Sequence, residues 1–182
     1  MSEGNYGVAL LNDCKYGYDA KENVLRLSLL RSPVRPDGGS DIGHHQFTYS
    51  LLPHAGNWRQ AQVDRHAYEL NIPVLAVALS QDNKMAQGTM PATQSLLDID
   101  SNSLIVEAVK QAETGEELIL RTFDSHGNHS KTPFSFGVNL EGVDETDLME
   151  ENPQEVTLTD SRSFTVQYTP LEIKTHRLKF KN

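Results

Sequence analysis

The sequence has 182 residues, of which 37% are hydrophobic and 23% charged, and its formal net charge is −9. This composition is typical of a soluble globular chain and excludes collagen, a coiled coil, a disulfide scaffold and wholesale disorder. The excess of 25 acidic over 16 basic residues argues against nucleic acid and anionic membranes as partners. No apolar stretch reaches the ~18 residues of a membrane span, no signal peptide is recognisable, and a single cysteine fits a reducing compartment. We therefore expect one domain over residues 1–182 and a cytoplasmic location.

Short apolar or alternating runs, separated by Gly, Asn, Asp and Pro, dominate the chain. This cadence predicts an all-β fold, an antiparallel β-sandwich. The expected strands cover residues 7–11, 24–29, 46–52, 74–79, 104–109, 117–123, 134–140, 155–158, 164–168 and 171–180. We expect the strand over 46–52 to stop at Pro53 because proline cannot donate to a strand ladder. Core side chains are expected at Leu27, Leu29, Phe47 and Tyr49.

One short helix is predicted between Asn57 and Asn71. Asn57 followed by Gln60 is a variant of the capping box, in which the two side chains bond each other's backbone N–H groups. Apolar side chains then recur at helical spacing, and Pro73 ends the pattern. The polar stretch over 81–93 shows no periodicity and is predicted to be a long loop.

The sequence offers no catalytic or metal-binding motif. It contains no HExxH, CxxC, GxSxG, Walker loop or GxGxxG. The adjacent His44 and His45 would point to opposite faces of a strand, and the pair His126 and His129 lies in a turn. We interpret these histidines as surface or hydrogen-bonded residues, and Cys14 as a buried, unreactive thiol.

The most unusual segment is residues 12–19, Asn-Asp-Cys-Lys-Tyr-Gly-Tyr-Asp, between two predicted strands. Aromatic faces beside hydrogen-bonding groups suit sugar recognition, because pyranose C–H faces stack on rings while hydroxyls bind polar partners. The alternative is a hairpin turn whose tyrosines cover their own core. The residue types alone leave both interpretations open.

Several motifs resemble the C-terminal β-domain of family 38 glycoside hydrolases, the retaining α-mannosidases. They are GVALLNDCKYGYD at 7–19, VLRLSLLRSP at 24–33, HQFTYSLLPH at 45–54, AYELNIP at 67–73, VKQAE at 109–113, ILR at 119–121 and LEIKT at 171–175. They follow the family's order over nearly the whole chain. Within the family, the resemblance is to the cytosolic and bacterial branch.

The resemblance implies a galactose-mutarotase-like sandwich that forms the non-catalytic C-terminal domain of a longer enzyme. That enzyme would hydrolyse terminal α-D-mannose residues with retention, through a glycosyl-enzyme intermediate. Its catalytic acids, and zinc or another divalent metal, would belong to an N-terminal catalytic domain absent from these residues, so no cofactor is expected in this chain. The implied partners are the enzyme's own catalytic domain, mannose-containing oligosaccharides and a possible homo-oligomer.

The family's turn between the first two strands also implies a site. In Golgi-type relatives this turn reads L-x-D-R-x-x-G and its arginine lies near the substrate cleft. Here Asp13 and Gly17 match, whereas Cys14 stands at the arginine position. The substrate-binding residues expected on this loop are Asp13, Lys15, Tyr16 and Tyr18.

Two other functions stay open at this point. The chain could be an independent carbohydrate-binding module, or a structural or oligomerisation domain with no sugar contact. A domain that normally docks on a catalytic partner should expose an apolar surface.

Overall fold

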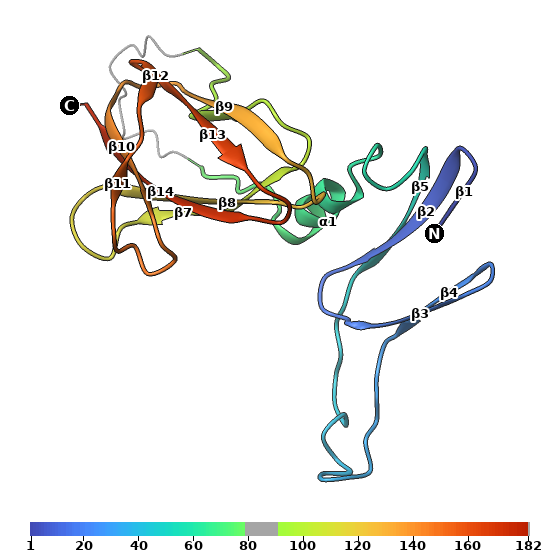
Figure 1. Cartoon of the computed structure of the whole chain (residues 1–182). Helices are drawn as coiled ribbons and strands as arrows, with labels where there is room; N and C mark the ends of the chain where they lie inside the picture. The colour runs from blue at the N-terminus through green and yellow to red at the C-terminus, as the bar shows by residue number, and fades with distance from the viewer. Residues whose placement is uncertain (79–90, 182) are drawn as a thin grey trace. The chain divides into compact units, whose positions relative to one another are not determined.

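A computed structural model describes residues 1–78 and 91–181, which form two compact units, Met1–Ala78 and Leu79–Asn182 (Figure 1). Antiparallel sheets and one short helix build the described residues, which confirms the predicted all-β class. That residues 1–182 act as one domain stays a prediction. Each unit is described by itself below.

The N-terminal unit contains a three-stranded sheet, a separate hairpin and the helix. The sheet has the order β1 (Ser2–Glu3), β2 (Tyr6–Asn12) and β5 (Tyr49–Ala55). The hairpin pairs β3 (Gly17–Lys21) with β4 (Val24–Ser28), and the helix α1 spans Val63–Asn71. Asn71 fastens the end of α1 to β2, because its Nδ2 donates to the backbone oxygen of Asn12 at 3.1 Å.

Strand β5 runs through Pro53, so the predicted stop at this proline is wrong. Pro53 lies opposite Val8 on β2. The backbone groups of Val8 bond to Met1 instead: Val8 N–H donates to Met1 O at 2.8 Å, and the Met1 amino group donates to Val8 O at 2.9 Å. The pairing of Val8 with Pro53 therefore requires no N–H from the proline. Since β5 is also the last strand of its sheet, it meets the condition under which strands tolerate proline.

The predicted capping box forms, but it closes a turn and not the helix. Asn57 Oδ1 accepts from the backbone N of Arg59 and Gln60 at 3.0 Å, and Gln60 Oε1 accepts from Asn57 N at 2.9 Å. Gln62 then adopts φ 49°, in the left-handed region, and α1 begins only at Val63. The helix is therefore shorter than the predicted span of Asn57 to Asn71.

The predicted core of the N-terminal unit is wrong. Leu27 and Phe47 are half-buried, whereas Leu29 and Tyr49 are exposed. Within residues 1–78 only Gly7 and Leu11 are buried. The strand expected over 74–79 is irregular and exposed as far as residue 78. Residue 79 and most of the loop expected over 81–93 lie outside the described residues.

The C-terminal unit is a sandwich of two antiparallel sheets (Figure 1). One sheet has the order β11 (Gln154–Glu155), β10 (Leu140–Thr146), β14 (Ile173–Phe180), β8 (Leu118–Asp124) and β7 (Leu104–Gln111). The other has the order β12 (Leu158–Asp160), β13 (Ser163–Tyr168), β9 (Ser130–Phe136) and β6 (Leu97–Ile99). The strands predicted over 104–109, 117–123, 164–168 and 171–180 are confirmed, with both ends of each within two residues of the prediction.

The core of the sandwich lies between these two sheets. Its buried apolar residues are Leu104, Leu120, Phe134, Phe136, Leu140, Val143, Phe164, Val166, Tyr168 and Leu178. The single strand predicted over 134–140 is wrong, because these residues divide between the end of β9 and the start of β10. Gly137 follows β9 and donates its N–H to the oxygen of Leu96 at 3.0 Å, next to the pairing of Leu97 with Phe136.

An imidazole side chain is also enclosed by this core. His176 on β14 is fully buried, and its ring centroid lies 5.3 Å from that of Phe164 and 6.1 Å from that of Phe134. Within residues 1–78 and 91–181, neither ring nitrogen has a hydrogen-bond partner. Glu145 Oε2 lies 3.9 Å from Nε2, beyond hydrogen-bond distance. Burial therefore lowers the pKa of His176 to about 4.

Candidate functional site

Residues 13–18, called the 13–18 loop here, join β2 to β3 and include the first two residues of β3; the asparagine that precedes them organises their conformation. Asn12 Oδ1 accepts from the backbone N of Cys14 at 3.1 Å and also from that of Lys15, which is the geometry of an Asx turn. Its Nδ2 donates to the hydroxyl of Tyr18. The turn formers of the sequence therefore hold this loop in a defined conformation.

Asp13 is engaged with the protein backbone. Both carboxylate oxygens lie 3.0 Å from the backbone N of Thr48, and Asp13 N donates to Thr48 O at 3.2 Å. The bond from Thr48 N–H, followed by a contact with Cys14, lowers the pKa of the Asp13 carboxyl. Asp13 therefore ties the loop to the segment before β5, and its carboxylate is already bound.

Cys14 is exposed, so the expectation of a buried thiol is wrong. The hydrogen bond to Asp13, followed by partial desolvation, raises the pKa of the thiol. A raised pKa keeps the thiol protonated at neutral pH and unreactive as a nucleophile.

Lys15 and Tyr16 reach an open groove of about 790 Å³. Lys15 Nζ lies 4.7 Å from the centroid of the Phe47 ring, a cation–π contact. The Tyr16 side chain is 91% exposed, so its ring covers no core of its own. The Tyr16 ring therefore does not cover a core of the turn itself, which was the alternative interpretation of this segment. Tyr18 is less exposed, at 52%, and its hydroxyl is bound to Asn12.

Of the four predicted site residues, Lys15 and Tyr16 line the groove. Neither Asp13 nor Tyr18 lines it. Its full lining is Cys14, Lys15, Tyr16, Gly17, Ser28, Leu29, Leu30, Arg31, Asp41 and His45.

Arg31 and Asp41 were not predicted as site residues. The hairpin register places Ser28 opposite Gly17, which carries the residues after β4 alongside the 13–18 loop. Recognising that hairpin in the sequence would have predicted the neighbourhood of Arg31. Asp41 is held by the backbone N of Ser32 at 2.5 Å, and its backbone oxygen bonds His45 Nε2 at 2.9 Å. His45 is thus hydrogen-bonded, as predicted.

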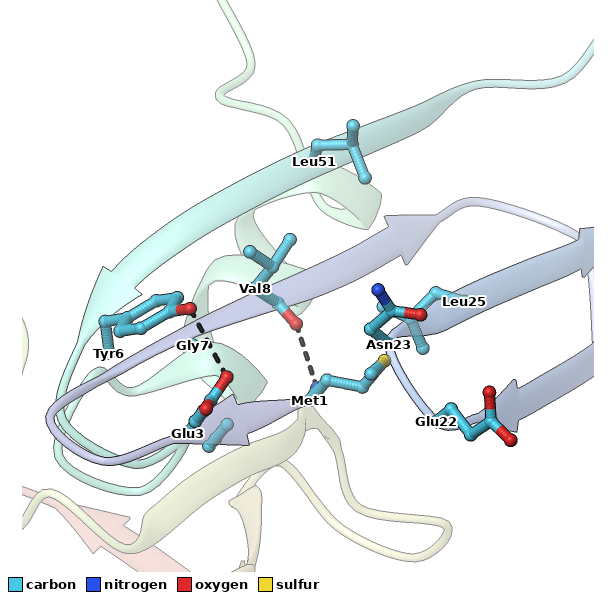
Figure 2. Close-up of a pocket in the computed structure, with 10 residues that line it drawn as sticks. Met1, Glu3, Tyr6, Gly7, Val8, Glu22, Asn23, Leu25 and Leu51 are labelled. Carbon is cyan, nitrogen blue, oxygen red and sulfur yellow. Dashed lines mark hydrogen bonds between the residues drawn. The ribbon is translucent and has the colours of Figure 1, made fainter.

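A second cavity of about 590 Å³ lies between β2 and the β3–β4 hairpin (Figure 2). Val8, Leu25 and Leu51 supply apolar lining, and Glu3 and Glu22 contribute carboxylates. The Tyr6 hydroxyl donates to Glu3 at 3.5 Å. Around it, Tyr6 is 55% and Leu51 64% exposed; that these side chains belong to an apolar docking surface stays a prediction.

The described residues do not fit a metal centre. Over 1–78 and 91–181, no three His, Cys, Asp or Glu side chains lie close enough to hold a metal ion. The same residues include no helix both long and apolar enough to cross a membrane.

The groove at Tyr16 combines the exposed ring of Tyr16, the cationic side chains of Lys15 and Arg31, and the carboxylate of Asp41. Such a set of groups can bind and orient a polyhydroxylated ligand.

The two units match two models of one enzyme family. Residues 103–176 match the "Glycosyl hydrolases family 38 C-terminal beta sandwich domain" and residues 1–39 the "Glycosyl hydrolases family 38 C-terminal domain". The chain therefore belongs to the non-catalytic C-terminal region of family 38 glycosyl hydrolases.

The curated proteins to which this chain is similar include several named as α-mannosidases. The chain is 36% identical to "Alpha-mannosidase 2C1" of Mus musculus over 96% of its length, and 37% identical to the protein of that name from Homo sapiens over 95%. It is 35% identical to "Alpha-mannosidase G" of Dictyostelium discoideum over 97%. These matches cover only 17%, 16% and 16% of the relatives, so the chain spans about a sixth of their length.

Proposed function

We propose that the chain is the C-terminal β-region of an α-mannosidase that hydrolyses terminal α-linked mannose residues. The observation that carries this proposal is the match of nearly the entire chain to about a sixth of several α-mannosidases. The reaction, by a retaining mechanism with a glycosyl-enzyme intermediate, belongs to the remaining part of such an enzyme. That part would also hold the catalytic acids and the zinc or other divalent metal. The names of the relatives also favour an enzyme of mannose metabolism. The single cysteine supports a cytoplasmic location for it.

Within that enzyme, we assign the N-terminal unit to the interface with the catalytic domain. Seven basic and eight acidic residues give residues 1–78 a net charge of −1, whereas residues 79–182 carry −8. A nearly neutral unit with exposed apolar side chains suits burial against another domain, because few charges would have to be desolvated. The acidic sandwich, by contrast, has a surface suited to water.

The 13–18 loop would then contribute one edge of the glycan-binding cleft. The exposed ring of Tyr16 provides a face for a pyranose, and Lys15 provides a hydrogen-bond donor to hydroxyls. Asp13 and Tyr18 position this loop through Thr48 and Asn12. Arg31 extends the polar lining of the same groove.

The experiment is an NMR titration of the 182-residue chain with α-linked manno-oligosaccharides, together with kinetics of the complete α-mannosidase. We expect Lys15→Ala and Tyr16→Ala to lower kcat/KM by about ten- to a hundredfold, as for loss of one charged hydrogen bond or one stacking contact. Tyr16→Phe keeps the ring and should retain most of the activity. Arg26→Ala is the matched control, because Arg26 pairs with Asp19 on the hairpin and does not line the groove.

The same experiment separates the alternatives. Amide shifts at residues 13–18 in the chain alone would favour an independent carbohydrate-binding module. Unchanged kcat/KM in both alanine variants would refute a sugar contact and favour a structural or oligomerisation domain.

A further inference from the structure

Residues 73–78 form an apolar segment with no partner strand in the part of the chain that the structure describes. The segment, Pro-Val-Leu-Ala-Val-Ala, begins two residues after the end of α1 and has no regular structure. Val74 is 97%, Leu75 88% and Val77 80% exposed. Three large apolar side chains in one short stretch are seldom left in water, because covering them is favourable.

The pattern of the segment specifies what should cover it. An edge strand or a half-buried strand alternates apolar and polar residues, whereas this run is apolar at every position. Such a run, bounded by a turn signal and containing β-branched residues, is typical of a strand with both faces buried. Pro73 stands at the start of the run, where a strand tolerates a residue without an N–H.

We propose that residues 73–78 are a β-strand that adds to a sheet in the remainder of the α-mannosidase polypeptide. The inference rests on the proposed function, because a longer polypeptide must supply that sheet. The curated relatives leave more than four fifths of their length outside the match, which is ample for a further β-domain. Backbone N–H and C=O groups from Val74 to Ala78 would make the ladder, and apolar layers would cover both faces.

A second copy of this chain fits the segment less well. Two identical segments paired about a two-fold axis give each strand a single neighbour and leave apolar surface uncovered. Each copy also carries a net charge of −9, which opposes association between copies. The remainder of the enzyme is therefore the occupant that we assign.

The test uses Val74→Asp and Val77→Asp in the full 182-residue chain, with the remainder of the same α-mannosidase produced as a separate polypeptide. In the chain alone both variants should unfold like the wild type, because substitutions at exposed positions change stability little. This measurement also shows that the variants fold. Binding to the remainder should weaken about a hundredfold, since an aspartate would then be buried without a partner.

The matched control is Met149→Asp, which changes a side chain that is 75% exposed on the loop between β10 and β11. It should bind the remainder like the wild type. Hydrogen exchange gives an independent result, because the amides of residues 74–78 should exchange freely in the chain alone and become protected in the complex.

Two results would overturn the inference while leaving the proposed function intact. One is wild-type binding by both aspartate variants, and the other is continued free exchange of residues 74–78 in an active complex. Self-association of the wild-type chain that Val77→Asp abolishes would make a second copy the occupant. Failure of the wild-type chain to bind the remainder or to support α-mannosidase activity would instead contradict the proposed function itself.

Discussion

Acidification should destabilise the C-terminal sandwich through His176. This side chain packs against both Phe134 and Phe164, and its ring nitrogens have no hydrogen-bond partner among the residues that the structure describes. Burial lowers its pKa from 6.5 to about 4; the charge of Glu145 opposes the shift and that of Lys174 adds to it. Glu145 is itself paired with Lys174, whose Nζ lies 2.6 Å from Oε1, and its charge offsets only part of the cost of burying an imidazolium.

The sign and the size follow from linkage. Between pH 6.5 and 4 the unfolded chain binds a proton at His176 and the folded chain does not, so stability falls as the pH falls. The shift from 6.5 to about 4, at about 1.4 kcal/mol per pKa unit, corresponds to a loss of about 3 kcal/mol. Carboxyl groups with lowered pKa values, such as Glu172, add their own loss, which begins near the ordinary carboxyl pKa of 4.5 and continues at more acidic pH.

The assay is native-state hydrogen exchange of buried amides on β8 and β10, measured at pH 7, 6, 5 and 4, which reports on this unit alone. His176→Phe should remove the loss between pH 6.5 and 4, and the difference from wild type isolates this side chain. His129→Gln is the control, because His129 is exposed and should leave the pH profile unchanged. A wild-type His176 ring that titrates near 6.5 by NMR, or a pH profile unaffected by His176→Phe, would refute this reasoning.

Three further predictions concern packing and hydrogen bonding. Phe164→Ala should lower the free energy of unfolding of the sandwich by about 3–5 kcal/mol, measured by urea titration, because Phe164 is fully buried and stacks on Phe134 at 5.3 Å and Phe136 at 5.8 Å. Thr122→Val should lower the free energy of unfolding by about 1–3 kcal/mol in the same titration. The reason is that the hydroxyl of Tyr168, a side chain only 2% exposed, is bound to Thr122 and would lose this partner. Adding Tyr168→Phe to Thr122→Val should recover part of the lost stability. Asp13→Asn should loosen the 13–18 loop and accelerate amide exchange at Thr48, whose N–H lies within reach of both Asp13 oxygens, whereas the exchange of Leu120 in the sandwich should not change.

The sandwich could be predicted from the sequence because its strands carry their own signals. Ser163–Tyr168 alternates with period two, whereas Leu118–Asp124 opens with an apolar run in which Ile119 and Leu120 are both buried. Both strands contribute side chains to the shared core. The boundary between β9 and β10 was missed because apolar residues continue across the turn at Gly137. Only the tertiary pairing of β9 with β13 and of β10 with β14 separates them.

The N-terminal unit was predicted less well for a physical reason. Hydrophobic pattern predicts burial, and Tyr49 and residues 74–78 have the pattern of buried strands but are exposed within this chain. The site was predicted in part: the residue types at 13–18 pointed to the loop, whereas Arg31 reaches the groove only through the β3–β4 pairing. Asp13 and Tyr18 turned out to shape the loop, a distinction that depends on where Thr48 and Asn12 lie.

The two units therefore differ in where substitutions should reveal their effects. The sandwich encloses a complete core, so its packing free energies can be measured in the 182-residue chain. Within residues 1–78 only Gly7 and Leu11 are buried, so replacing Val74 or Leu51 removes few contacts in this chain. If the remainder of the enzyme covers these side chains, the same replacements become core substitutions there, with the costs of about 2–5 kcal/mol that such truncations carry. Equal effects of Leu51→Ala in the chain and in the complete enzyme would argue that the apolar surface of the N-terminal unit stays uncovered.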